Sequence, residues 1–137
     1  MTARAPGSKK AYVIDTQVFV WWVSKPARLG SEAARALRAV DAGRARAWIP
    51  SIVGVELTLL GEVGRLRIGV AELEAATKRN DEVRILVHDL PQAGEFALLR
   101  SVADPFDRMI VAAARAADLP LMTADSTSPR AVDVIWE

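Results

Sequence analysis

The chain has 137 residues, of which 51% are hydrophobic, and a formal net charge of +1. This length suits one domain with a single core, and so small a charge gives no sign of a general polyanion binder. The absence of cysteine excludes disulfides, zinc–thiolate sites and thiol nucleophiles. The single histidine, His88, excludes a multi-histidine metal site within one chain.

The N-terminal segment 1–10 is polar and basic and lacks the apolar stretch of a signal peptide. The most apolar run, residues 12–23, contains Asp15 and is too short to cross a bilayer. We therefore expect a soluble, cytoplasmic protein with no membrane contact. We also expect residues 1–10 to be disordered and residues 11–137 to form one domain.

Short apolar runs alternate along the chain with amphipathic segments. The runs that predict strands are 11–15, 46–50, 83–90, 120–125 and 131–136. The segments that predict helices are 31–43, 51–66, 70–80, 92–102 and 104–119, while 18–23 is ambiguous and could form a helical turn on the sheet. This alternation predicts an α/β fold, with a mostly parallel central sheet covered by helices on both faces.

Capping residues mark several of the predicted helix ends. Ser31 and Ser51 are expected to cap the helices that follow them, and another helix is expected just after Pro91. Gly43 suits a helix end. Asp104, followed by proline, is typical of a helix N-cap, and we expect capping to be its main role.

Four acidic residues stand at corresponding ends of these elements. Asp15 and Asp125 close the first strand and the run 120–125, so both lie where parallel strands end and where ligands bind in open α/β sheets. Glu56 lies in the second turn of its predicted helix among apolar neighbours, and Asp107 lies in the first turn of another. Helices that follow strands begin at this same edge, so we expect the four carboxylates to surround one pocket.

Asp107 differs from Asp104 in the helix face that it occupies. It shares a face with Ile110, Val111 and Ala114, which is a face destined for the core. The helix N-terminus is expected to favour its charged form, which a metal needs. We therefore predict that Asp107 serves a metal site whereas Asp104 caps the helix.

Each acid also has a purely structural interpretation. Asp15 suits a turn after a strand, and Asp125 suits an Asx-turn. Glu56 is the hardest to explain in this way, because a glutamate between apolar neighbours is rarely left buried and unpaired. Convergence of all four favours a functional site.

Converging carboxylates raise each other's pKa, and a bound divalent cation removes the repulsion. A site with only oxygen ligands favours Mg²⁺ or Mn²⁺ over zinc. Such an ion can activate a water and stabilise a phosphodiester during in-line displacement. The residues thus predict metal-dependent phosphodiester hydrolysis.

The chain resembles PIN-domain nucleases, and among them the VapC-type toxins of bacterial toxin–antitoxin pairs. The segments that carry the resemblance are YVIDTQVFVWWV, IPSIVGVELTLL, DPFDRMIVAAARAADLPLMTAD and VDVIW, in the family's order from about residue 12 to the end. The run DPFDR followed by an alanine-rich helix and LPLMTAD is the most specific of them.

This resemblance implies an RNA-cleaving enzyme that uses Mg²⁺ or Mn²⁺, is held inactive by a cognate VapB-type antitoxin and forms a homodimer. It assigns the four catalytic carboxylates to Asp15, Glu56, Asp107 and Asp125, of which Asp15 and Asp107 are expected to bind the metal. Gln17 stands where close relatives often carry histidine, and we expect this to affect substrate choice more than the reaction.

Other side chains receive supporting roles with structural alternatives. Thr123 is expected either to orient Asp125 or simply to suit a strand. Arg108 either steers phosphate or is a solvated helix residue. A set of surface arginines could follow an RNA backbone, although such charges are usually just solvated: Arg28, Arg35, Arg38, Arg65 and Arg67.

Three other classes of protein agree less well with these residues. A PIN-like module that only binds a partner would usually lack one of the four acids. A phospho-receiver domain would need a lysine after its last core strand, and the lysines here lie elsewhere. A sugar-phosphate phosphatase would carry a second aspartate two residues after the first, where this chain has Gln17.

Overall fold

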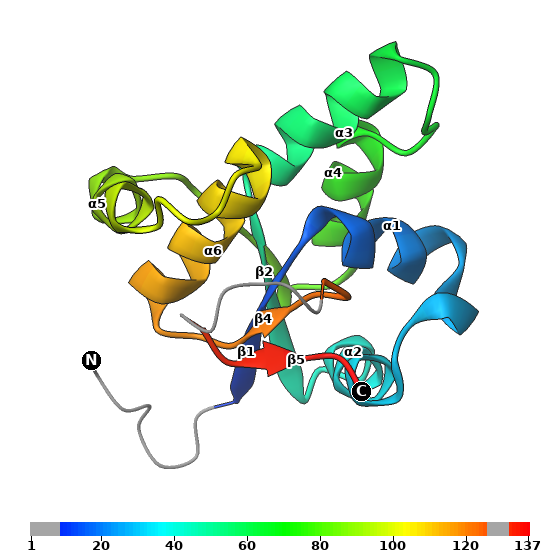
Figure 1. Cartoon of the computed structure of the whole chain (residues 1–137). Coiled ribbons are helices and arrows are strands. Elements are labelled where there is room, and N and C mark those ends of the chain that lie inside the picture. The colour runs from blue at the N-terminus through cyan, green and yellow to red at the C-terminus, as the bar shows by residue number, and fades with distance from the viewer. Residues whose placement is uncertain (1–8, 126–131) are drawn as a thin grey trace.

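A computed structural model describes residues 9–125 and 132–137. Its centre is a five-stranded sheet in which all neighbouring strands are parallel, in the order β3-β2-β1-β4-β5 (Figure 1). The strands are β1 (Lys10–Ile14), β2 (Ala45–Pro50), β3 (Val83–Leu86), β4 (Leu121–Met122) and β5 (Val134–Ile135). This arrangement confirms the predicted α/β fold and places β1 in the middle of the sheet.

Helices cover both faces of the sheet. They are α1 (Thr16–Ser24), α2 (Ser31–Asp41), α3 (Ile52–Glu62), α4 (Val70–Arg79), α5 (Leu90–Leu98), α6 (Pro105–Ala117) and a short 3-10 helix, η1 (Pro26–Arg28). Figure 1 shows α5 and α6 on one side of the sheet and α1 and α2 on the other. Within the described ranges, no helix has both the length and the apolar character that a membrane crossing needs.

The core lies between the sheet and these helices. Because both faces are covered at the centre of the sheet, β1 beyond its first residue and β4 are apolar on both sides, as buried parallel strands require, whereas the edge strand β3 leaves Arg84 and Ile85 exposed. On α6, the run of small side chains from Ala112 to Ala114 is fully buried, which lets this helix lie close to β1. Since α6 is followed directly by the parallel strand β4, its N-terminus points to the edge where the strands end.

The sequence predictions of helix starts need three corrections. Ser31 is not the cap of α2 but its first residue, and Gly30 is the N-cap. Ser51 does stand at the predicted N-cap position of α3, but its side chain makes no capping hydrogen bond; its hydroxyl instead accepts a hydrogen bond from the backbone N–H of His88 (3.3 Å). The helix expected after Pro91 begins at Leu90 instead, because Asp89 caps it.

Several predicted boundaries also change. The strands predicted over 120–125 and 131–136 shorten, within the described residues, to Leu121–Met122 and Val134–Ile135, and the helix predicted over 51–66 ends at Glu62. The apolar run 18–23 forms the middle of helix α1 (Thr16–Ser24), which settles its ambiguous periodicity. The strand predicted over 83–90 stops at Leu86, since Asp89 already begins the cap of α5. Residues 1–8 of the segment expected to be disordered lie outside the described residues, and β1 begins at Lys10.

Candidate active site

Asp15 stands directly after β1 and caps helix α1. Its Oδ1 accepts a hydrogen bond from the backbone N–H of Val18 (2.8 Å), while its own N–H donates to the carbonyl of Met122 in β4 (3.2 Å). The pKa of Asp15 is raised to about 6, chiefly by burial and to a smaller extent by the nearby carboxylates of Asp107 and Glu56. Asp15 thus serves the local turn and also belongs to a group of interacting acids.

Asp107 lies in the first turn of α6, with its carboxyl in the same electrostatic neighbourhood. Although Asp107 follows the helix face of Ile110 and Val111, it is itself exposed rather than buried in the core. Partial desolvation nevertheless raises the pKa of Asp107 to about 6, and the charges of Asp104, Glu56 and Asp125 act in the same direction. The sequence led us to expect that the helix N-terminus would favour the charged form. In the structure that effect is outweighed by partial desolvation and by three neighbouring carboxylates.

Glu56 enters the site from helix α3, and its orientation is fixed by a residue that the sequence analysis did not single out. The hydroxyl of Thr16, a buried residue at the start of α1, donates a hydrogen bond to Oε1 of Glu56 (2.6 Å). Thr16 follows Asp15 directly, so its position beside a predicted site residue was the available signal. The adjacent residues Asp15 and Thr16 therefore contribute an acid of the site and the hydroxyl group that orients Glu56.

Thr123 connects the ends of β1 and β4. Its buried hydroxyl hydrogen-bonds the Asp15 side chain, which opposes the rise in the pKa of that carboxyl. The same oxygen accepts a hydrogen bond from the backbone N–H of Asp125 (3.1 Å). The expected link between Thr123 and Asp125 is therefore present through the backbone, and a second link to Asp15 accompanies it.

Asp104 has the capping role predicted for it. Its Oδ1 accepts hydrogen bonds from the backbone N–H groups of Phe106 (2.9 Å) and Asp107 (3.0 Å), and the residue is the N-cap of α6. Because the same carboxylate also raises the pKa of Asp107, it acts on the site through charge.

Arg108 is directed towards helix α5. Its Nε donates to the carbonyl of Phe96 (2.9 Å), and its guanidinium lies 4.0 Å from the centroid of the Phe96 ring. This contact ties α5 to α6. It gives the arginine a structural partner, which neither sequence interpretation of Arg108 foresaw.

The four predicted acids thus lie at one edge of the sheet, and each interacts electrostatically with at least one of the others. Their donors are all carboxylate oxygens, which suits a hard divalent cation such as Mg²⁺. In the described part of the chain, however, no three acidic or histidine side chains are arranged to hold an ion directly. Carboxylates interact electrostatically over several ångströms, whereas a ligand oxygen must lie about 2.0–2.6 Å from the ion. The chemistry of these side chains therefore fits a cation, but the carboxylates are spaced more widely than direct ligation requires.

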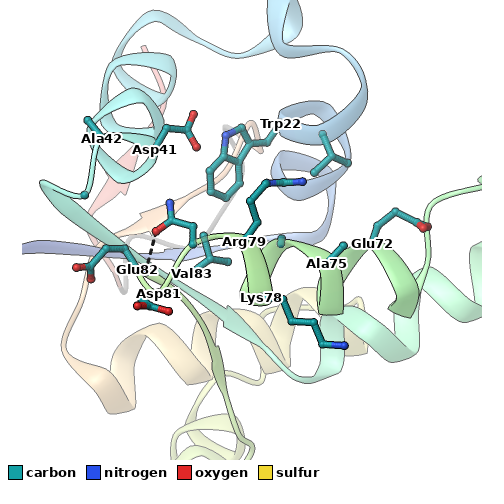
Figure 2. Close-up of a pocket in the computed structure, with 14 residues that line it drawn as sticks. Trp22, Asp41, Ala42, Glu72, Ala75, Lys78, Arg79, Asp81, Glu82 and Val83 are labelled. Atoms are coloured by element: carbon teal, nitrogen blue, oxygen red, sulfur yellow. Dashed lines mark hydrogen bonds between the residues drawn. The ribbon is translucent and has the colours of Figure 1, made fainter.

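A large cavity lies elsewhere, where β2 and β3 begin. It has a volume of about 1130 Å³ and lies between the ends of α1, α2 and α4. Figure 2 shows Trp22, Asp41 and Arg79 bordering it from these three helices. Its charged residues are of both signs and it includes none of the four predicted acids, so it is separate from the carboxylate edge.

Comparison with solved structures identifies the same fold in toxin–antitoxin complexes. VapBC2 from Rickettsia felis, bound to a DNA fragment from its promoter, aligns with a TM-score of 0.66 at 17% identity, covering 93% of this chain and 99% of the other. DNA-bound VapBC from Salmonella typhimurium aligns with a TM-score of 0.62 at 16% identity, covering 93% of this chain and 97% of the other. FitAcB from Neisseria gonorrhoeae aligns with a TM-score of 0.58 at 21% identity, covering 90% of this chain and 95% of the other.

At these identities the likeness is one of fold, and no curated protein sequence matches the chain significantly. The sequence itself matches the model of one family, described as the PIN domain, over residues 12–133. That match spans most of the chain, from β1 to the residue before β5. The parallel sheet and the family match lead to the same conclusion: this chain belongs to the PIN-domain family.

Proposed function

We propose that the protein is a metal-dependent ribonuclease of the VapC type, the toxin of a toxin–antitoxin pair. The observation that carries this proposal is the coupling of Asp15 and Asp107, whose pKa values are both raised to about 6. Acids with strongly raised pKa values cluster at functional sites, and an edge of acids at strand ends suits a cation.

We assign Asp15 and Asp107 as the residues that hold Mg²⁺ or Mn²⁺. When bound, such an ion supplies positive charge that activates water and stabilises a phosphodiester under attack. Thr16 holds one oxygen of Glu56, which leaves the second oxygen of that carboxylate available to the site. Thr123 holds Asp15 and the backbone at Asp125, so two buried hydroxyl groups keep the acidic edge in order.

A protein partner is supported by the comparisons and by the surface. The similar structures are toxin–antitoxin complexes, and we extend to this chain a cognate antitoxin of the VapB type and a homodimeric state. Several large apolar side chains are left exposed on α3 and β3, among them Val55, Leu59 and Ile85, beside an apolar groove of about 460 Å³. Exposed apolar surface of this kind is what protein partners cover.

The purified protein should cleave single-stranded RNA in the presence of Mg²⁺ or Mn²⁺, and excess EDTA should stop cleavage. Expression of the protein alone should arrest growth, whereas co-expression with the product of a neighbouring antitoxin gene should restore it. Cleavage that continues undiminished in EDTA would contradict the metal site. Growth without arrest, together with no cleavage under any condition, would favour a PIN-like module that only binds a partner.

A further inference from the structure

A groove lined by basic side chains lies at the edge of the sheet opposite to the acids. It has a volume of about 850 Å³ and is formed by α2, the starts of β1 and β2, Pro120 and Ile135. Five basic residues line it against one acidic residue, Glu32; they are Lys9, Lys10, Arg35, Arg38 and Arg44. Since the whole chain has a net charge of only +1, this is a local concentration of positive charge.

The fold brings these cations together from separate segments. Arg35 and Arg38 are three residues apart on α2, so they share one helix face. Lys10 pairs with Ala45 in the parallel register of β1 and β2, and Arg44 immediately precedes Ala45. The groove therefore combines a helix face with the beginnings of two adjacent strands.

Most of these basic side chains form no ion pair with another described residue. Lys9 forms an ion pair with Glu82, but in ranges 9–125 and 132–137 the exposed side chains of Lys10, Arg35, Arg38 and Arg44 form none. The segments 1–8 and 126–131 contain no aspartate or glutamate, so they supply no acidic side chain. By contrast, the cavity of Figure 2 mixes both signs of charge, as protein surfaces usually do.

We propose that this groove binds the phosphodiester backbone of single-stranded RNA at a distance from the acidic edge. Unpaired cations in a cleft focus a positive field, and a basic groove that follows one backbone is the usual way to bind single strands. The choice of RNA as the source of the backbone rests on the proposed function, while the charge complementarity does not.

The position of the groove sets a length for the RNA. β1 leads from Lys10 in the groove to Asp15 five residues later, which is about 17 Å at 3.3–3.4 Å per residue. At the rise of about 3.4 Å per nucleotide of a stacked strand, this distance corresponds to roughly five nucleotides. An RNA of several times this length can therefore contact the groove and the acidic edge together.

The test compares two triple variants of the full-length protein that lose the same charge. Arg35→Gln/Arg38→Gln/Arg44→Gln removes charge from the groove. Lys25→Gln/Lys78→Gln/Arg100→Gln removes it from exposed positions outside the groove. Binding of a labelled, unstructured 20-nucleotide RNA is followed by fluorescence anisotropy in EDTA, so that no cleavage is required. Melting curves check that both variants remain folded, which is expected because all six replaced side chains are exposed.

The groove variant should bind RNA about tenfold more weakly or worse. The slope of the logarithm of the association constant against the logarithm of salt concentration should become less steep by about 2, which is about 0.7 for each of the lost phosphate contacts. The control should stay within about threefold of the wild type. Equal losses in the two variants, or no loss in either, would overturn the proposal.

Further arms of the experiment identify the ligand. Tighter groove-dependent binding of duplex DNA would assign the groove to DNA, and competition by polyglutamate at equal charge would assign it to an acidic protein; either result would overturn the RNA assignment. Groove-dependent RNA binding by a protein that cleaves nothing would keep this proposal and refute the ribonuclease. If the protein cleaves RNA but the groove variant binds RNA as tightly as the wild type, the ribonuclease is supported and the groove proposal is refuted.

Discussion

At the scale of single residues, two aspartates three positions apart at the start of α6 have different surroundings: Asp104 is its N-cap and Asp107 lies in its first turn. One oxygen of Asp104 already accepts two backbone N–H groups, whereas Asp107 interacts with the carboxylates of Glu56 and Asp125. The same residue type therefore caps a helix at one position and belongs to the acidic edge at the other.

The substitutions Asp104→Asn and Asp107→Asn should consequently have different effects. Asparagine caps helices about as well as aspartate, so Asp104→Asn should change stability by less than about 1 kcal/mol and keep much of the cleavage rate. Asp107→Asn should stay folded but lose cleavage by about a hundredfold or more, because a neutral amide is a poor ligand for a hard cation. Melting temperature and cleavage rate are measured for both; an active Asp107→Asn beside an inactive Asp104→Asn would reverse the two roles.

Thr16 offers a second residue-scale prediction. Thr16→Val keeps the shape of this buried side chain but removes the hydroxyl that donates to Glu56, whereas Thr16→Ser keeps the donor. Losing an orienting hydrogen bond to a charged group should lower the cleavage rate roughly tenfold or more. Serine should retain most of the rate. If the valine and serine variants cleave equally fast, Thr16 does not orient Glu56 for the reaction.

The role of a single residue was predictable from the sequence where it depends on neighbouring residues in the chain. The cap at Asp104 follows from the residues beside it, and the structure confirms it. The hydrogen bond from Thr16 to Glu56 joins residues 40 positions apart, so no local pattern contains it. The roles of the four acids in catalysis stay predictions.

At the scale of elements, helix α2 begins against the C-terminal segment. The backbone N–H of Ala33 in its first turn donates to the carbonyl of Trp136 (3.0 Å), and Gly30, the N-cap, lies against the same carbonyl. A Cβ atom at Gly30 would stand 2.3 Å from that oxygen. This contact explains why Gly30, and not Ser31, is the N-cap of the helix. The carbonyl of Trp136 comes from the far end of the chain, so the residues around Ser31 could not reveal it.

Gly30→Ala should therefore destabilise the protein by about 1–3 kcal/mol, because backbone has to move to make room for the methyl group. Gly94→Ala is the matched control, since Gly94 lies within α5 and has open space around it. Alanine there should stabilise by up to about 1 kcal/mol through helix propensity. Urea denaturation of both variants decides the matter, and equal midpoints would show that the C-terminal contact does not constrain α2.

At the scale of the whole molecule, the order of strands and helices was predictable because apolar runs and amphipathic segments alternate along the chain. The spacing of the carboxylates was not, since it depends on how α3, α6 and two strand ends pack together. The edge on which the acids lie follows from parallel connectivity alone. Their raised pKa values follow from burial and mutual repulsion, which only the packed structure contains.

The pH dependence belongs to this scale. Asp15 and Asp107 have pKa values of about 6 in the folded protein against 3.8 ordinarily, so the folded state binds more protons between these values. Their contribution to stability is therefore fully present below about pH 4 and is lost as the pH rises through 6. Without metal, the protein should be roughly 1–3 kcal/mol more stable at pH 5 than at pH 8, after allowance for solvent around Asp107.

Cleavage should follow the opposite trend, because only the ionised carboxylates bind a cation, and it should fall as the pH drops below about 6. Urea denaturation in EDTA at several pH values, beside cleavage rates at saturating Mn²⁺, tests both trends. Glu82, whose pKa is lowered mainly by hydrogen bonds from Lys9 and Arg46, loses its stabilising effect only at more acidic pH. A metal-free protein whose stability increases from pH 5 to pH 8 would show that the two aspartates are not coupled as described.

The central claim is that Asp15 and Asp107 belong to one cation site, and calorimetric titration with Mn²⁺ at pH 7.5 tests it most directly. The wild type should bind Mn²⁺, Asp104→Asn should bind it with similar affinity, and Asp15→Asn and Asp107→Asn should each lose about tenfold or more in affinity. Both aspartates must matter for the claim to hold. Unchanged Mn²⁺ binding in either of these two variants, with the fold intact, would contradict it.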